Sequence, residues 1–120
     1  MERVTGIGGL FFRSSDPAGS ARWYSEHLGI NAGGEGESDV WQQAAGPTVF
    51  APFAKDTEYF PERNSWMLNL RVANLDAMVA QLRNAGINVE ITFEDDNVGR
   101  FARLSDPDGN PIELWEQKGN

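Results

Sequence analysis

Residues 106–116 read DPDGNPIELWE, from Asp106 to Glu116, and this stretch is the most specific signal of fold in the chain. Its first half combines proline, glycine, asparagine and aspartate, the residue types that form tight chain reversals. Its second half, from Pro111 onward, carries the apolar residues typical of a buried strand. A second apolar run, residues 99–104, lies just before the turn. The stretch therefore predicts two neighbouring strands, residues 99–104 and 111–116, joined by a turn.

Upstream, residues 66–88 predict a strand, then a helix, and then the end of that helix. Four apolar residues alternate with Met67, Asn69 and Arg71; they are Trp66, Leu68, Leu70 and Val72. Such alternation is typical of a strand with one covered face, so the other three side chains should point to the opposite face. Asn74 is a good N-cap for the helix that follows, which carries an apolar stripe. A further strand is expected over residues 88–93.

The first half of the chain repeats this order. Residues 8–31 also run from an apolar strand through a capped helix, here with Asp16 before Pro17, to a Gly-Ile-Asn tripeptide. Apolar runs at residues 40–44 and 48–53 predict further strands. We therefore expect an α+β domain over residues 1–120 made of two tandem βαβββ modules. Their expected limits are about 1–54 for module one, 55–65 for the connection and about 66–120 for module two.

This order of motifs resembles the vicinal oxygen chelate superfamily. The resemblance rests on Asp16-Pro17 with the helix that follows, on residues 72–76 (VANLD) and above all on residues 106–115. The superfamily includes glyoxalase I, the bleomycin and fosfomycin resistance proteins, and the extradiol dioxygenases. The resemblance implies a glyoxalase-like fold, in which curled mixed and antiparallel sheets form a cleft. It also implies a homodimer.

The resemblance further implies where a divalent metal would bind, and most of those positions are unsuitable here. Gly9 and Met67 stand where the first strand of each module would carry a ligand, and neither is a good ligand for a hard ion. The last strand of module one, residues 48–53, contains no acid and no histidine. Glu113 alone remains, and His27 belongs to a helix. We therefore expect no metal and no other cofactor, with Glu113 the ligand only if a metal is present.

The charge and the composition of the chain limit the classes of molecule that the protein is expected to bind. The formal net charge is -8, which disfavours nucleic acid and anionic membranes as partners. The chain has no cysteine, so disulfides and thiolate sites are excluded. The longest early apolar run, residues 7–12, is too short to span a bilayer. We expect a cytoplasmic protein whose partner is a small organic ligand.

The strand alternation predicts which side chains line the cleft. The candidate ligand-binding residues are Arg71, Asn69, Met67, Trp115, Trp41, Phe11 and Arg13. Arg13 and Arg71 could each hold an oxyanion of the ligand, or an arginine could instead pair with Glu113. Glu113 is the candidate catalytic residue, as a general base, unless it has only such a structural role. Tyr59, in the connection, either caps the cleft or only pins that segment to the domain.

Three functions remain open from the sequence. The leading hypothesis is a protein that binds a small organic molecule with cationic and planar parts, without the usual metal site. The second is a metal-dependent lyase, isomerase or dioxygenase of the same superfamily. The third is a non-catalytic dimeric interaction module. Fold alone does not decide between them.

Overall fold

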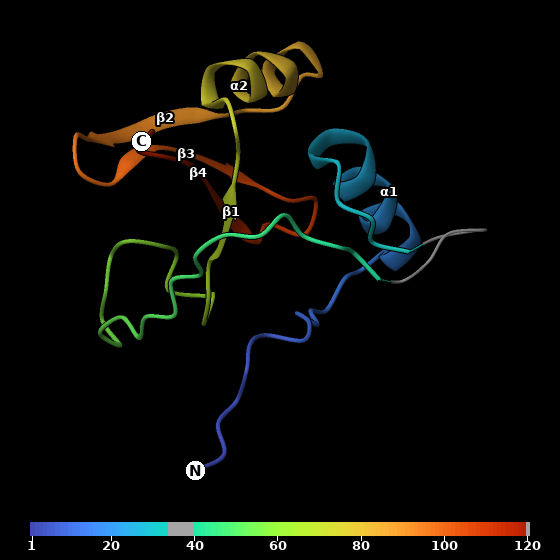
Figure 1. Cartoon of the computed structure of the whole chain (residues 1–120). Helices are drawn as coiled ribbons and strands as arrows, with labels where there is room; N and C mark the ends of the chain where they lie inside the picture. The colour runs from blue at the N-terminus through green and yellow to red at the C-terminus, as the bar shows by residue number, and fades with distance from the viewer. Residues whose placement is uncertain (34–39, 120) are drawn as a thin grey trace.

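The computed structural model describes residues 1–33 and 40–119 (Figure 1). In chain order the elements are α1 (Pro17–Leu28), β1 (Leu68–Arg71), α2 (Leu75–Asn84), β2 (Glu90–Asp95), β3 (Gly99–Ser105) and β4 (Pro111–Gln117). Within these ranges no helix is long and apolar enough to cross a membrane.

The strands form one mixed, open sheet in the order β1-β4-β3-β2. β1 runs parallel to β4, and the pairs β4 with β3 and β3 with β2 are antiparallel. The four strands expected in the second half of the chain are all present, each within two residues of its predicted start. The α+β class is confirmed.

Both helices begin where the sequence places a cap. The side chain of Asp16 accepts a hydrogen bond from the backbone N–H of Gly19 at 3.0 Å, and Pro17 opens α1. Asn74 does the same for Ala77, also at 3.0 Å, at the start of α2. Gly29 then ends α1 in the left-handed conformation, with φ of 70°, which costs a glycine little.

The hydrophobic core lies between α2 and one face of the sheet. Its largest fully buried side chains are Leu75, Leu82, Ile112 and Leu114. Tyr24 of α1 joins this core, and its hydroxyl donates to Asp106 at 2.6 Å, so α1 is tied to the turn between β3 and β4. Burial of apolar side chains of this size contributes about 1.5–3 kcal/mol each and is the main source of stability.

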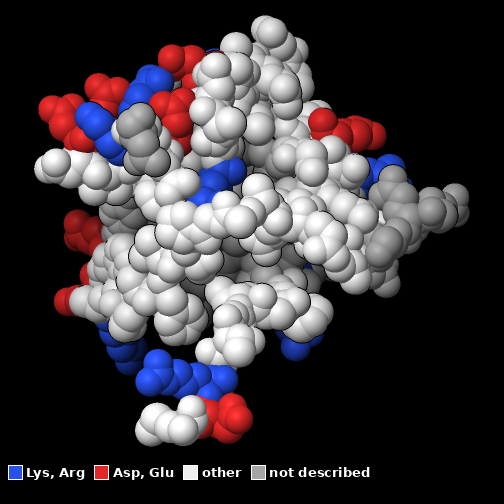
Figure 2. All heavy atoms as spheres, viewed as in Figure 1, with Lys and Arg blue, Asp and Glu red and all other residues white. Residues whose placement is uncertain are grey.

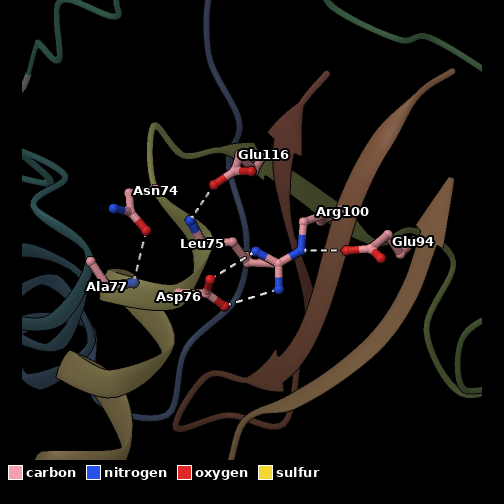
Figure 3. A network of polar contacts seen from close by, with 7 residues as sticks. All are labelled: Asn74, Leu75, Asp76, Ala77, Glu94, Arg100 and Glu116. Carbon is pink, nitrogen blue, oxygen red and sulfur yellow. Dashed lines mark hydrogen bonds and ion pairs between the residues drawn. The ribbon is translucent and has the colours of Figure 1, made fainter. Parts of the chain in front are cut away.

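Polar contacts fix the start of α2 against the sheet (Figure 3). Arg100 of β3 pairs with Asp76 in the first turn of α2 at 2.9 Å and with Glu94 of β2 at 2.7 Å. The carboxylate of Glu116 accepts a hydrogen bond from the backbone N–H of Leu75 at 2.8 Å. Since the partners of Arg100 are exposed, each ion pair contributes little stability, and the set chiefly orients the helix.

The first half of the chain differs from the prediction. The strands expected at residues 8–13, 40–44 and 48–53 are absent from the described residues, and these segments run without regular structure (Figure 1). The prediction of two tandem modules is therefore not confirmed. A strand needs a neighbouring strand for its hydrogen bonds, and within a single described chain these segments have none. Their apolar side chains lie exposed, as in Phe11 and Phe50.

On the face seen in Figure 2 the acidic groups lie toward the edges, and a basic group lies within the otherwise largely uncharged middle. The red acidic groups visible in this view are thus mainly at its periphery.

Candidate functional site

One face of the sheet is left uncovered by the helices, and polar side chains from three strands meet on it. The strand register places Asn69 of β1 opposite Glu113 of β4, and Glu113 opposite Arg103 of β3. Residues directly opposite in a sheet share one face, so these three side chains point the same way. Leu70 and Leu114 point to the other face, toward α2. This is the division that the alternation in the sequence predicts.

Glu113 is a buried carboxylate with both oxygens engaged. The residue is 4% exposed, and Asn69 donates its amide N–H to Oε1 at 2.8 Å. The hydroxyl of Tyr59 donates to Oε2. Arg103 lies farther off, with its Nε 4.0 Å from Oε2. A buried charge is costly unless it is paired and hydrogen-bonded, and these three neighbours meet that need. We refer to Glu113, Asn69, Tyr59 and Arg103 as the carboxylate cluster.

Tyr59 holds the connecting segment on this cluster. The guanidinium carbon of Arg103 lies 4.8 Å from the centroid of the Tyr59 ring, and the same guanidinium donates to the Tyr59 carbonyl. Burial raises the pKa of Tyr59 to about 12, and the hydrogen bond to Glu113 adds to the rise. The phenol is therefore protonated at neutral pH and acts as a donor. A cavity of about 530 Å³ adjoins it, lined by residues 56–62 and Arg103.

Beside the cluster, three aromatic rings form a row across β2, β3 and β4. The centroids of Phe93 and Phe101 are 5.7 Å apart, and those of Phe101 and Trp115 are 6.1 Å apart with planes at 4°. Phe101 is 9% exposed, whereas Phe93 is 52% exposed. We call these three residues the aromatic row. Phe101 lies between the other two rings, and the exposed Phe93 ring at one end of the row offers aromatic surface to a planar molecule.

A glycine holds one end of the row in place. The indole N–H of Trp115 donates to the carbonyl of Val98 at 3.0 Å, which requires the chain to pass close to the ring. Gly99 makes this approach with φ of 133°, and a Cβ there would collide with the carbonyl oxygen of Glu116 and lie 3.0 Å from the indole nitrogen. Trp115 is therefore set by the backbone of the β2–β3 turn.

Two predicted site residues lie at a different hollow. Arg71 donates to the carbonyl of Ala44 at 3.0 Å, and Arg71 and Trp41 both line a cavity of about 350 Å³ between the ends of the helices and β1. The other walls of this cavity are mainly apolar, with Leu28, Ile30 and Met78 among them. The arginine nearest to Glu113 is thus Arg103 and not Arg71.

The remaining candidates are not gathered at Glu113. Phe11 is 95% exposed, and Arg13 is exposed as well. Met67 is half-buried and precedes β1. Phe12 packs instead against the core side, with ring centroids 5.7 Å from Tyr24 and 6.4 Å from Trp66. Of the predicted set, Asn69, Arg71 and Trp115 lie on the same sheet face as Glu113, although the guanidinium of Arg71 turns to the carbonyl of Ala44.

The residues around Glu113 do not fit a divalent metal ion. Within residues 1–33 and 40–119, no group of three or more His, Asp or Glu side chains could hold a metal. The oxygens of Glu113 already accept hydrogen bonds, and its neighbours Asn69, Tyr59 and Arg103 present donors toward it. Hard divalent ions need several oxygen ligands, so this donor set suits a hydrogen-bonding ligand better.

Sequence reasoning missed Arg103 and left the role of Tyr59 open. A signal for Arg103 is present in the sequence, because Arg103 lies two residues after Phe101 on the strand of residues 99–104 and so shares its face. For Tyr59 no local pattern predicts the contact, which joins residues 54 positions apart.

The fold and this face together define a class of protein: an open mixed sheet with helices on one side and a face with aromatic and polar side chains on the other. Residues 9–115 match the family described as the glyoxalase-like domain. The chain therefore belongs to this family, and with it to the vicinal oxygen chelate superfamily.

Solved structures agree with this assignment. TnmS3, an antibiotic-binding protein from Streptomyces sp. CB03234, is 26% identical, covers 98% of this chain and 99% of its own, and superposes with a TM-score of 0.63. A glyoxalase/bleomycin resistance protein from the same organism is 29% identical over 85% of this chain and 92% of its own, with a TM-score of 0.51.

Virulence protein STM3117 from Salmonella typhimurium shares the fold, with 18% identity over 91% of this chain and 99% of its own and a TM-score of 0.52. No curated protein matches the chain.

Proposed function

We propose that this protein binds a planar aromatic small molecule on the uncovered face of its sheet and needs no metal to do so. The observation that carries the proposal is the aromatic row of Phe93, Phe101 and Trp115 beside the carboxylate cluster. Rings supply stacking area, and the cluster supplies a few placed polar groups, which is how small-molecule sites are generally built.

The likeness to TnmS3 supports binding over catalysis. That protein binds an antibiotic, and it is similar to this chain over nearly its whole length. The second similar protein is a glyoxalase/bleomycin resistance protein. Sequestering an antibiotic needs an apolar stacking surface and no reacting group. In this reading Glu113 is a polar anchor for the ligand and not a general base.

Binding is tested by titrating the purified protein with bleomycin and with a panel of polycyclic aromatic antibiotics, by calorimetry and thermal shift. A ligand that prefers the native state raises the melting temperature. Trp115→Leu should lower the affinity for any compound that binds by about tenfold or more, because stacking contributes about 1–3 kcal/mol per aromatic contact. Trp41→Leu, at the other hollow, is the matched control. Failure of every compound to bind would refute the proposal.

The metal-free part has its own test. Elemental analysis of the purified protein should find no stoichiometric divalent ion, and a chelator should leave ligand binding unchanged. A chelator that abolishes binding, with rescue by one added metal, would instead favour the metal-dependent enzyme of this superfamily.

We also propose that the protein is a homodimer in which first-half segments of one copy meet the sheet of the other. Phe50 is 86% exposed and Phe11 95% exposed, and β1 is an edge strand with one free side. Exposed apolar segments and a free strand edge are costly to leave uncovered. Light scattering should give twice the mass of 13.3 kDa. A monomer at micromolar concentration would contradict this part.

A further inference from the structure

The side chain of Tyr59, itself an aromatic alcohol, is held against Glu113 and Arg103. Its hydroxyl donates to Glu113, and its ring lies against the guanidinium of Arg103, 4.8 Å from the centroid. Asn69 holds the other oxygen of Glu113 at 2.8 Å and so keeps the carboxylate oriented. These contacts bind the phenol of Tyr59. The same three residues are available to the phenol of a ligand once Tyr59 is displaced.

The segment that carries Tyr59 is only lightly attached. Residues 54–62 contain turns and bends but no helix or strand. The Tyr59 residue is 44% exposed, and a cavity of about 530 Å³ adjoins it. Loops with few buried contacts open at low cost, so the phenol can leave while the sheet stays intact.

One hydrogen-bond donor of the site, the Nε–H of Arg103, has no partner among the described residues, and this donor limits which chemical groups of a ligand fit the site. Arg103 Nε is buried, has no hydrogen-bond partner and lies 4.0 Å from Glu113 Oε2. The Tyr59 hydroxyl does not accept from this N–H, but a ligand hydroxyl that is not tethered to the chain can shift to accept from it while it donates to the carboxylate. An ammonium group has nothing to accept with, and a carboxylate would be repelled by Glu113. The site therefore favours a neutral hydroxyl on an aromatic ring.

We infer that Glu113, Asn69 and Arg103 bind the phenolic ring of a ligand, and that Tyr59 fills this position when the ligand is absent. The inference rests on the proposed function and names the class of ligand: a hydroxylated aromatic molecule whose remaining rings extend over the aromatic row. Tyr59 is then an internal competitor, because any ligand must displace it, and the apparent affinity falls by the fraction of open sites.

The first experiment uses p-cresol, the side chain of tyrosine, as the probe. The Tyr59→Ala variant should bind p-cresol about tenfold or more tightly than the wild type, measured by calorimetry. Tyr59→Phe, which keeps the ring but loses the hydrogen bond to Glu113, should bind it more tightly than the wild type and less tightly than Tyr59→Ala. In the Tyr59→Ala protein, 4-methylanisole should bind about tenfold more weakly than p-cresol, because it has nearly the same size but no hydroxyl donor.

Two further variants locate the bound probe. Adding Glu113→Gln to Tyr59→Ala should weaken p-cresol binding, since the hydrogen bond loses its charge. Adding Trp41→Leu should leave p-cresol binding unchanged. Equal binding of p-cresol and 4-methylanisole, or equal binding by wild type and Tyr59→Ala, would overturn the inference. If larger aromatic compounds still bind through Trp115, the proposed function survives that failure.

A measurement on the wild type covers the case in which Tyr59→Ala does not fold. The chain has two tyrosines, so 13C-labelled tyrosine rings yield two sets of NMR signals, from Tyr59 and from Tyr24. Saturating p-cresol should move the Tyr59 signals toward those of a free tyrosine, while those of buried Tyr24 stay in place. Signals of Tyr59 that do not move with bound p-cresol would contradict the displacement.

Discussion

The hydroxyl of Tyr59 donates a hydrogen bond to Glu113, a residue only 4% exposed, across a separation of 54 residues. This contact joins the connecting segment to the last strand of the sheet. It also leaves a buried carboxylate with a neutral donor on one oxygen, an amide donor on the other, and Arg103 within 4.0 Å.

Tyr59→Phe should lower the free energy of unfolding by about 1–3 kcal/mol, because one oxygen of a buried carboxylate loses its donor. Urea denaturation measures the loss. Glu113→Gln should cost less in the Tyr59→Phe background than in the wild type, since the two residues interact directly. Additive costs would mean that the two side chains are not coupled in solution.

Stability should fall at alkaline pH. The pKa of Tyr59 is raised to about 12 in the folded protein, chiefly by burial, against 10.0 for a free tyrosine. A raised pKa means that the folded state holds the proton more tightly, so this stability is present below pH 10 and is lost as the pH rises toward 12. Because the residue is partly exposed, solvent screening reduces the effect to about 1 kcal/mol.

A second residue, Tyr24, also contributes to the loss of stability at alkaline pH, and the Tyr59→Phe variant separates the two contributions. Burial also raises the pKa of Tyr24, and its hydrogen bond to Asp106 adds to the rise. Unfolding followed by urea between pH 9 and 12 should show a shallower decline in Tyr59→Phe than in the wild type. A slope unchanged by this substitution would show that Tyr59 does not titrate as the contacts imply.

Tyr24→Phe should destabilise the protein by about 1–3 kcal/mol, because Asp106 is buried and loses the 2.6 Å bond that ties α1 to the β3–β4 turn. Ser20→Ala is the matched control on the same helix. The Ser20 hydroxyl is buried without a partner, so its removal should be neutral or stabilising. The melting temperature should therefore fall in Tyr24→Phe and stay unchanged or rise in Ser20→Ala. An equal fall in both variants would contradict a stabilising hydrogen bond between Tyr24 and Asp106.

Gly99→Ala should cost about 1–3 kcal/mol or more, since φ is 133° and the added Cβ would meet backbone at Glu116. The same change should loosen Trp115 and reduce binding of a stacked ligand. Gly119→Ala is the control, because nothing lies within 4 Å of its Cβ position. Chemical denaturation and Trp fluorescence follow both effects. A Gly99→Ala protein as stable as the control would show that this turn can rearrange freely.

Several features were predictable because their causes are local. The caps at Asp16 and Asn74 depend on a side chain and the backbone three residues on, and both were placed correctly. Alternation along β1 assigned Asn69 to the uncovered face, since the side chains of a strand alternate by geometry. The DPDGNPIELWE stretch predicted the β3–β4 turn for the same kind of reason.

Other features depend on which distant segments meet. Three first-half strands were expected from apolar runs, but a run becomes a strand only where a partner strand supplies hydrogen bonds. Arg71 was a candidate partner of Glu113, yet it reaches the carbonyl of Ala44, and Arg103 takes the place beside the carboxylate. The cytoplasmic location, the catalytic role of Glu113 and the limits of the two modules stay predictions.

The sequence by itself determined the family, the second-half strands, both helices and the face on which Glu113 lies, because these follow from short-range periodicity and from motifs contiguous in the chain. Only the tertiary structure decided that Tyr59 caps Glu113, that Arg103 is its cationic neighbour and that Phe93, Phe101 and Trp115 lie in a row. Those contacts join segments far apart in sequence, and their formation depends on strand register and core packing, which no local pattern encodes.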